Sequence, residues 1–208
     1  MSRRLVAALF AAAGLLTATA VSAVEWDRFS DKDGVLVERR MVPGSRIGEI
    51  RVTAHSPLAS AAVFETIWKY DEYPQFVPFL KRLKLLSDTG DERVAYEQLT
   101  LPLVKDRDYT VRFRRHVDPA THRYEISIEG ANEAGPPPDS THVRVTNIRG
   151  GWTTEPGPDG KGSLVRYEMM SDPGGRIPAW VADRTMPRAA ADLMRAMLKR
   201  ALAKNGGK

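Results

Sequence analysis

Short strands fill the middle of this sequence, and one long amphipathic helix follows them. Apolar and polar residues alternate between residues 81 and 170, most clearly over 124–128 and 165–169. Alternation with a period of two is typical of a strand that has one face covered. We therefore expect an antiparallel meander here, with strands over residues 83–86, 94–101, 109–113, 124–128, 143–148 and 164–169.

The final helix is predicted from residue 178 onwards. Its apolar residues recur at helical spacing and form a single stripe, so the helix has one face to bury. Pro187 lies within this pattern, and we expect it to kink the helix or to restart it. The stripe comprises Met186, Ala190, Leu193, Met194, Met197, Ala201 and Leu202.

The part before residue 81 adds two strands and a helical region. Strands are predicted over residues 35–42 and 47–54, and Ser56-Pro57 is expected to begin a helix that ends at Trp68. A short helical turn is predicted over residues 75–80. This order of elements indicates an α+β fold, in which a curved antiparallel sheet wraps around the long terminal helix.

The first 23 residues have the pattern of a secretory signal peptide. Arg3 and Arg4 precede a short apolar run over residues 5–16, and small residues at 21–23 suit cleavage. We expect one mature domain over residues 24–208, periplasmic or secreted, with a retained N-terminal anchor as the alternative. The absence of cysteine fits this location, since a small periplasmic domain need not carry a disulfide.

Basic residues are concentrated near the C-terminal end. The chain has a formal net charge of +5, and residues 176–208 contain eight Lys or Arg against Asp183 and Asp192. A basic helix can make transient contact with an anionic membrane surface, although a solvated helix face is the simpler interpretation. We expect a monomer that does not bind nucleic acid.

Several kinds of catalytic or metal site are excluded by the residues themselves. The sequence has no cysteine for a thiolate site, and its four histidines have no metal-ligand spacing. It also has no G-x-S-x-G elbow and no phosphate-binding loop, and Gly150-Gly151 is predicted to be a turn. We expect no metal, no cofactor and no catalytic residue.

Several motifs in the same order resemble the START family, the lipid-transfer branch of the helix-grip proteins. The family opens with a tryptophan, a DGI-like strand and a VPGS-like turn, and it has an Arg-Asp-aromatic signature followed by an arginine. Its last helix begins with a DPGG-IP-W motif. The matching residues here are Trp26, 33–37, 42–45, Tyr96-Glu97, Arg107-Asp108-Tyr109 with Arg112, Gly151-Trp152, 172–180 and Met186-Pro187; Asp183 stands where the family usually has Asn.

The resemblance implies a deep cavity between the sheet and the last helix, sized for one lipid. It also implies that Glu97 and Arg112 face this cavity and contact the head group of the ligand. Glu97 shares its strand face with apolar residues, so a carboxylate there needs a partner such as Arg112. For Arg112, a structural ion pair and a solvent position remain as alternatives, because it alternates with Val111 and Phe113.

The last helix supplies the remaining candidate ligand-binding residues, Trp180, Met186, Leu193 and Met197. Methionine side chains suit a pocket that adapts to varied lipids, because thioethers pack flexibly. Ordinary packing between helix and sheet is the alternative for each methionine, and anchoring of the helix start is the alternative for Trp180. Arg107 and Asp108 are expected to fix the strand entry through local polar bonds.

The leading functional hypothesis is a periplasmic protein that binds, and possibly transfers, one lipid without chemical change. A quinone or polyketide ligand is the first alternative, because residues 70–79 also resemble the helical turn of coenzyme-Q-binding relatives. The second is a cyclase or hydrolase that uses Glu97 as an acid or base. The third is a structural role, in which side chains fill the cavity.

Overall fold

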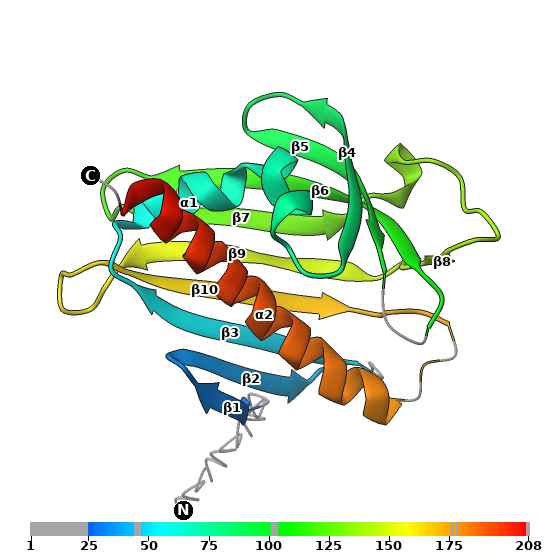
Figure 1. The fold of residues 1–208 in the computed structure, drawn as a ribbon, viewed down its shortest axis with the longest axis horizontal. Helices are drawn as coiled ribbons and strands as arrows, with labels where there is room; N and C mark the ends of the chain where they lie inside the picture. Colours follow the sequence, from blue (N-terminus) through cyan, green and yellow to red (C-terminus); the bar gives the residue numbers. More distant parts are fainter. Residues whose placement is uncertain (1–24, 44–46, 101–103, 176, 178, 207–208) are drawn as a thin grey trace, which may run out of the picture.

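The computed structural model describes residues 25–43, 47–100, 104–175, 177 and 179–206. In this part of the chain, a curved ten-stranded sheet is crossed diagonally by the C-terminal helix (Figure 1). The strand order is β1-β2-β3-β10-β9-β7-β6-β5-β4, with the short β8 alongside β6. All pairs are antiparallel except β6 with β8, and β1 and β4 are the open edges. The predicted α+β helix-grip fold is confirmed.

The elements follow the predicted order, with a few additions. The chain forms β1 (Asp27–Lys32), β2 (Val35–Met41), β3 (Gly48–Ser56), α1 (Ser60–Trp68), the 3₁₀ helix η1 (Tyr70–Gln75), β4 (Leu80–Asp88), β5 (Glu92–Leu99), β6 (Arg107–Asp118), β7 (Arg123–Gly130), η2 (Asn132–Ala134), β8 (Val143–Arg144), β9 (Ile148–Pro156), β10 (Ser163–Ser171) and α2 (Ala179–Asn205).

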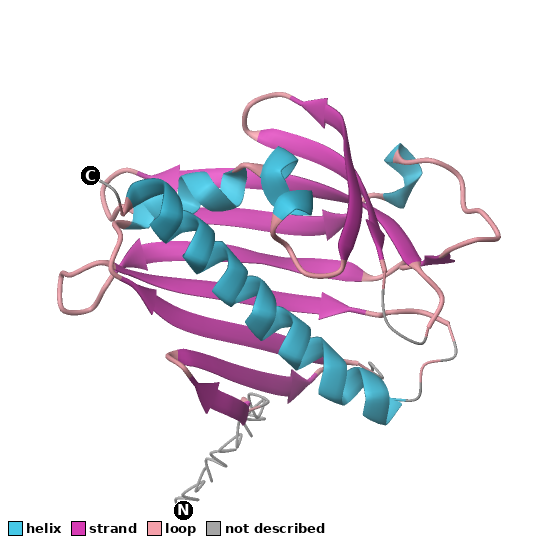
Figure 2. Ribbon diagram, in the orientation of Figure 1, coloured by secondary structure: helices cyan, strands magenta, loops and turns pink. Residues whose placement is uncertain are grey.

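Several local predictions need correction. The strand β1 was not predicted, and the short helical turn lies at η1 rather than over residues 75–80. The strand predicted over residues 143–148 is present only as the two-residue β8, and the unpredicted β9 begins at Ile148. The helix α1 begins at Ser60, because the hydroxyl of Ser56 accepts a hydrogen bond from the backbone N–H of Leu58 at 3.2 Å and forms a turn instead of a helix cap. Helix α1, drawn in cyan in Figure 2, therefore starts three residues later than expected, whereas η1 starts five residues earlier.

The glycine pair at positions 150 and 151 is also different from its prediction. It lies inside β9 and not in a turn. A Cβ on Gly150 would come 2.1 Å from the carbonyl oxygen of Glu168, and one on Gly151 would come 2.2 Å from that of Ile126. Both neighbouring strands approach β9 so closely that only glycine fits there.

Helix α2 covers the inner face of the sheet. It contacts β2, β3 and α1, and it continues as one helix through Pro187, where a break had been predicted. Met194 and Met197 are fully buried in the core that α2 shares with the sheet and α1. Within the described residues, no helix has both the length and the apolar character needed to cross a membrane.

An apolar cavity between the sheet and the last helix

A cavity of about 260 Å³ lies between the sheet, α2 and the segment that joins η1 to β4. Its wall is mostly apolar, and Glu97 and Arg107 are the charged side chains among its described lining residues. The lining residues are Ile50, Tyr70, Tyr73, Val77, Pro78, Phe79, Leu80, Glu97, Leu99, Arg107, Tyr109, Val111, Phe113, Ile128, Val145, Ile148, Trp152, Tyr167, Met169, Ser171, Pro173, Met186, Ala189, Ala190 and Leu193.

Glu97 is the buried acid of this cavity, as the sequence predicts. It lies on β5 opposite Tyr109 of β6, is 7% exposed, and accepts a hydrogen bond from the Tyr109 hydroxyl at 2.7 Å. Burial raises the pKa of the Glu97 carboxyl to about 7, although the Tyr109 hydrogen bond acts in the opposite direction. In the described part of the chain, no ion pair joins Glu97 to a cation.

Four tyrosines surround this acid, and none of them was predicted as a site residue. Tyr70 and Tyr73 come from η1, Tyr109 from β6 and Tyr167 from β10. Burial raises the pKa of each phenol, and the nearby Glu97 raises it further. Together these residues add uncharged hydroxyl groups and one buried carboxyl group to the cavity wall, which also includes Arg107.

The strand β6 presents alternate residues to the cavity and to the outer face. Arg107, Tyr109, Val111 and Phe113 line the cavity, whereas Asp108 lies on the other side. The guanidinium of Arg107 donates from Nε to the Pro173 carbonyl at 3.3 Å and from Nη1 to the Lys105 carbonyl, and burial lowers its pKa. The predicted local polar bonds of Arg107 are present, but its place on the cavity wall was missed.

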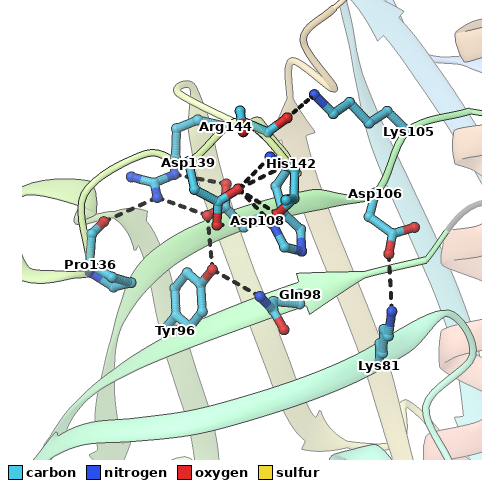
Figure 3. A network of polar contacts seen from close by, with 12 residues as sticks. Lys81, Tyr96, Gln98, Lys105, Asp106, Asp108, Pro136, Asp139, His142 and Arg144 are labelled. Carbon is cyan, nitrogen blue, oxygen red and sulfur yellow. Dashed lines mark hydrogen bonds and ion pairs between the residues drawn. The ribbon is translucent and has the colours of Figure 1, made fainter.

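Asp108 fixes the orientation of β6 from outside the cavity (Figure 3). Its carboxylate is 1% exposed and accepts two hydrogen bonds from Arg144, at 2.9 and 2.8 Å. The Tyr96 hydroxyl donates a third at 2.9 Å. The hydrogen bonds from Arg144 hold the pKa of Asp108 below its usual range despite burial. Because adjacent residues of a strand point in opposite directions, this outward pairing keeps Arg107 and Tyr109 inward.

Arg112 lies on the outer face of the sheet, which contradicts its predicted contact with a ligand head group. Its guanidinium is 3.4 Å from a carboxylate oxygen of Glu92 and 3.9 Å from one of Glu133. The alternation with Val111 and Phe113 decides its direction, since both of these residues line the cavity. The expected pair of Glu97 and Arg112 is therefore not formed.

Replacing Arg112 should leave ligand binding unchanged. We expect Arg112→Gln to bind any ligand of this cavity with the affinity of the unmodified protein, and to lose at most about 1 kcal/mol of stability, because its ion pairs are partly exposed. Ligand titration and urea denaturation check the two expectations. A loss of affinity greater than tenfold would show that Arg112 acts on the cavity.

The candidate ligand-binding residues on α2 have three different outcomes. Met186 and Leu193 line the cavity as expected, and their contact with a ligand stays a prediction. Met197 is fully buried in the core one turn beyond the cavity, where α2 packs against α1, so it is a packing residue. Trp180 lies in the first turn of α2, and its side chain is outside the described residues.

Phe79 gives the cavity wall an unusual backbone conformation. It stands between η1 and β4 with a φ of 64°, which bulky residues seldom adopt, and its side chain is 41% exposed. Its carbonyl accepts a hydrogen bond from the backbone N–H of Thr100 at 2.9 Å, which holds this turn against the end of β5. Strained residues of this kind are concentrated at binding sites.

Known proteins with a similar sequence and fold include lipid-transfer proteins. Residues 48–204 match the family described as polyketide cyclase / dehydrase and lipid transport. The chain belongs to this family. The resemblance to the START proteins is confirmed by a solved structure, the fragment 25–204 of a STAR-related lipid transfer protein from Xanthomonas axonopodis. It is 25% identical, has a TM-score of 0.76, and the match covers 85% of this chain and 98% of that one.

Two further proteins, one a sequence relative and one a structural neighbour, are also similar to this chain. The phosphatidylcholine transfer protein of Mus musculus is 24% identical over 185 residues, which cover 86% of this chain and 85% of that protein. The ZhuI aromatase/cyclase of a Streptomyces species shares the fold, with 15% identity, a TM-score of 0.55 and coverage of 77% of this chain and 98% of that one. The fold of this chain is thus found both in a STAR-related lipid transfer protein and in an aromatase/cyclase.

Proposed function

We propose that this protein is a carrier that holds one lipid molecule in the cavity beneath α2 and does no chemistry on it. The observation that supports this most is the cavity itself, with its mostly apolar wall between the sheet and the helix. Transfer of apolar surface from water into such a wall is favourable by roughly 25 cal/mol per Å². The similarity to the mouse phosphatidylcholine transfer protein also supports a lipid ligand.

The size of the cavity restricts the ligand. Its volume of about 260 Å³ is just below the usual range of ligand pockets, roughly 300–1,000 Å³. A single acyl chain or a compact ring system is therefore favoured over a lipid that buries two long chains without movement of α2.

Native mass spectrometry tests the carrier function directly. We expect protein purified from membrane-containing extracts to carry one lipid per chain, and organic extraction followed by mass spectrometry to identify it. A protein that stays empty after exposure to a broad panel of phospholipids, sterols and fatty alcohols would contradict the proposal.

We also propose export of the protein. The predicted signal peptide, residues 1–23, lies outside the described residues, and its sequence pattern supports the proposal. Fractionation of cells, with N-terminal sequencing of the recovered protein, should find a chain that begins near Val24 in the periplasm or medium. Recovery of the full chain with the membranes would instead support a retained anchor.

Contact of α2 with an anionic membrane is a further part of the proposal. Arg200 and Lys204 form ion pairs with Glu72, so the charges of these two basic groups are already balanced within the protein. Arg184 and Arg188, near the cavity-lining part of α2, are exposed and form no ion pair with a described residue. Sedimentation with anionic vesicles, but not with zwitterionic ones, would support contact through this end of the helix.

A cyclase or a carrier of polyketides or quinones is the second candidate. The observation that favours it is Glu97, a buried carboxyl with a pKa of about 7, which suits an acid or base at neutral pH. The absorbance of the extracted ligand distinguishes a quinone or polyketide from a lipid. Conversion of a bound ligand, lost in Glu97→Gln while binding persists, would support catalysis.

A further inference from the structure

A second hollow lies on the outer face of the sheet, on the side away from the cavity. It has a volume of about 350 Å³ and is open to solvent. Gly151 lies at its floor, because the neighbouring Trp152 faces the cavity and adjacent residues of a strand point in opposite directions. The carbonyl of Ile126 leaves no room for a Cβ atom at Gly151, so no side chain of its own covers the backbone here.

Two arginines at this hollow are left without a partner. Arg149 lies two residues before Gly151 on β9, and Arg166 of β10 is opposite Thr153. Neither arginine forms an ion pair or a hydrogen bond with a residue that the structure describes, and the Nε of Arg166 is buried in this state. Because a buried donor without a partner is unfavourable, this arrangement suits a group that comes from outside the chain.

The hollow also contains acids, which restrict what that group can be. Glu49, Glu125 and Glu168 line it together with the two arginines. A simple anion would lie beside three carboxylates and would be repelled by them. An uncharged group avoids this repulsion, and a carboxylate oxygen can accept a hydrogen bond from it.

The same face of the sheet already holds an aromatic ring between two arginines. Trp26 precedes β1, and the guanidinium carbons of Arg40 and Arg51 lie 4.4 and 4.1 Å from the centroid of its ring. A guanidinium group is attracted to the face of an aromatic ring by the electrostatic field of the π electrons. Arg149 and Arg166 have free guanidinium groups that can make the same contact with a second ring.

We propose that this outer hollow binds a planar aromatic ring that carries an N–H or O–H donor, namely a tryptophan or tyrosine side chain of a partner protein. The ring lies on the bare backbone at Gly151. Arg149 and Arg166 face its π surface, and the carboxylate of Glu125 or Glu168 accepts its hydrogen bond. Because the hollow and the cavity lie on opposite faces of the sheet, the partner can bind whether the cavity is filled or empty.

NMR titration with N-acetyl-tryptophanamide tests the proposal. We expect saturable shifts, with a dissociation constant in the millimolar range, for the Nε–H signals of Arg149 and Arg166 and for the amides of Ser127 and Thr153, because these groups lie around the ring. N-acetyl-cyclohexylalaninamide has no π electrons and should bind at least about fivefold more weakly. Equal binding of the two probes, or shifts confined to the cavity, would overturn the proposal.

Arginine variants locate the site. Arg149→Gln and Arg166→Gln should each weaken binding of the tryptophan probe by about two- to fivefold, the contribution of one guanidinium group to ring binding. Their melting temperatures should stay the same, since neither side chain has a partner among the described residues. Arg82→Gln, the same change at an exposed position of β4, should leave binding unaltered. Unchanged affinity in the double variant Arg149→Gln/Arg166→Gln would refute the site.

Two controls separate this site from an anion site and from the cavity. An excess of inorganic phosphate at constant ionic strength should leave binding of the tryptophan probe unchanged, because the carboxylates disfavour an anion. Displacement of the probe by phosphate would identify an anion site and overturn the proposal. Ala189→Trp, which narrows the cavity from α2, should bind the probe normally. Loss of binding in this variant would place the probe in the cavity and also overturn the proposal.

Discussion

The ligand-free protein should lose about 3 kcal/mol of stability through Glu97 as the pH rises from 4.5 to 7. Burial raises the pKa of this carboxyl from 4.5 in the unfolded chain to about 7 in the folded one. Between these values the folded state holds a proton that the unfolded state has released, so stability falls with rising pH. The contribution is fully present below pH 4.5 and is lost above pH 7.

The surroundings of Glu97 explain why no other group cancels this effect. Tyr109 faces it from β6, Tyr70 and Tyr73 from η1, and Tyr167 from β10, and all four phenols stay neutral because their pKa values are raised. Arg107 lines the same cavity and donates hydrogen bonds to backbone carbonyls. The residues that α2 adds to the wall are uncharged.

Urea denaturation at several pH values, with Glu97→Gln as the comparison, measures the effect. The variant should match the unmodified protein at pH 4.5 and exceed its stability by about 3 kcal/mol at pH 8, because the neutral amide has no charge to bury. Glu65→Gln, the same change at an exposed position of α1, should leave the pH profile unaltered. Parallel profiles for the Glu97 variant and the unmodified protein would contradict the burial of a proton.

Filling the cavity from α2 should abolish ligand binding and leave the fold intact. Ala189 lines the cavity from the helix and has a small side chain. In Ala189→Trp the indole occupies space that the ligand needs, so we expect affinity for any cavity ligand to fall by about a hundredfold or more, equivalent to at least about 2.7 kcal/mol. Calorimetric titration with the ligand identified by mass spectrometry gives the affinity.

An alanine on the far end of the same helix provides the control. Ala203 is exposed, and Ala203→Trp adds the same indole to α2 away from the cavity. This variant should bind normally. Circular dichroism and the melting temperature show whether either variant is folded. A folded Ala189→Trp protein that still binds its ligand at full affinity would place the binding site elsewhere.

The sequence predicted the arrangement of sheet and helix because period-two and helical patterns report which face of an element is covered. The same period-two pattern indicates which residues of β6 face the cavity. Tyr109, Val111 and Phe113 form one apolar face, and this face includes Arg107 and excludes Arg112. The resemblance to the START family predicted that Arg112 faces the cavity. The alternation of side chains along β6 already indicated that Arg112 faces the opposite side of the sheet.

Other features could not be read from the sequence because they depend on contacts between distant segments. The two adjacent glycines of β9 are typical of a turn when only the sequence is known. The structure shows that the strands on either side leave no room for a Cβ atom at these positions. The tyrosines around Glu97 come from three separate elements, and nothing local predicts that they meet. Met197 has the same spacing as the cavity-lining residues of α2, and only the extent of the cavity shows that it belongs to the core.

The division of α2 into two halves has a consequence for how such a protein can change over generations. Residues of its first half, such as Met186, Ala189 and Leu193, shape the cavity, whereas Met194 and Met197 hold the helix to the core. Substitutions in the first group alter which molecule fits, because these side chains border the cavity. The range of ligands can therefore diversify by single substitutions on one helix while the architecture persists.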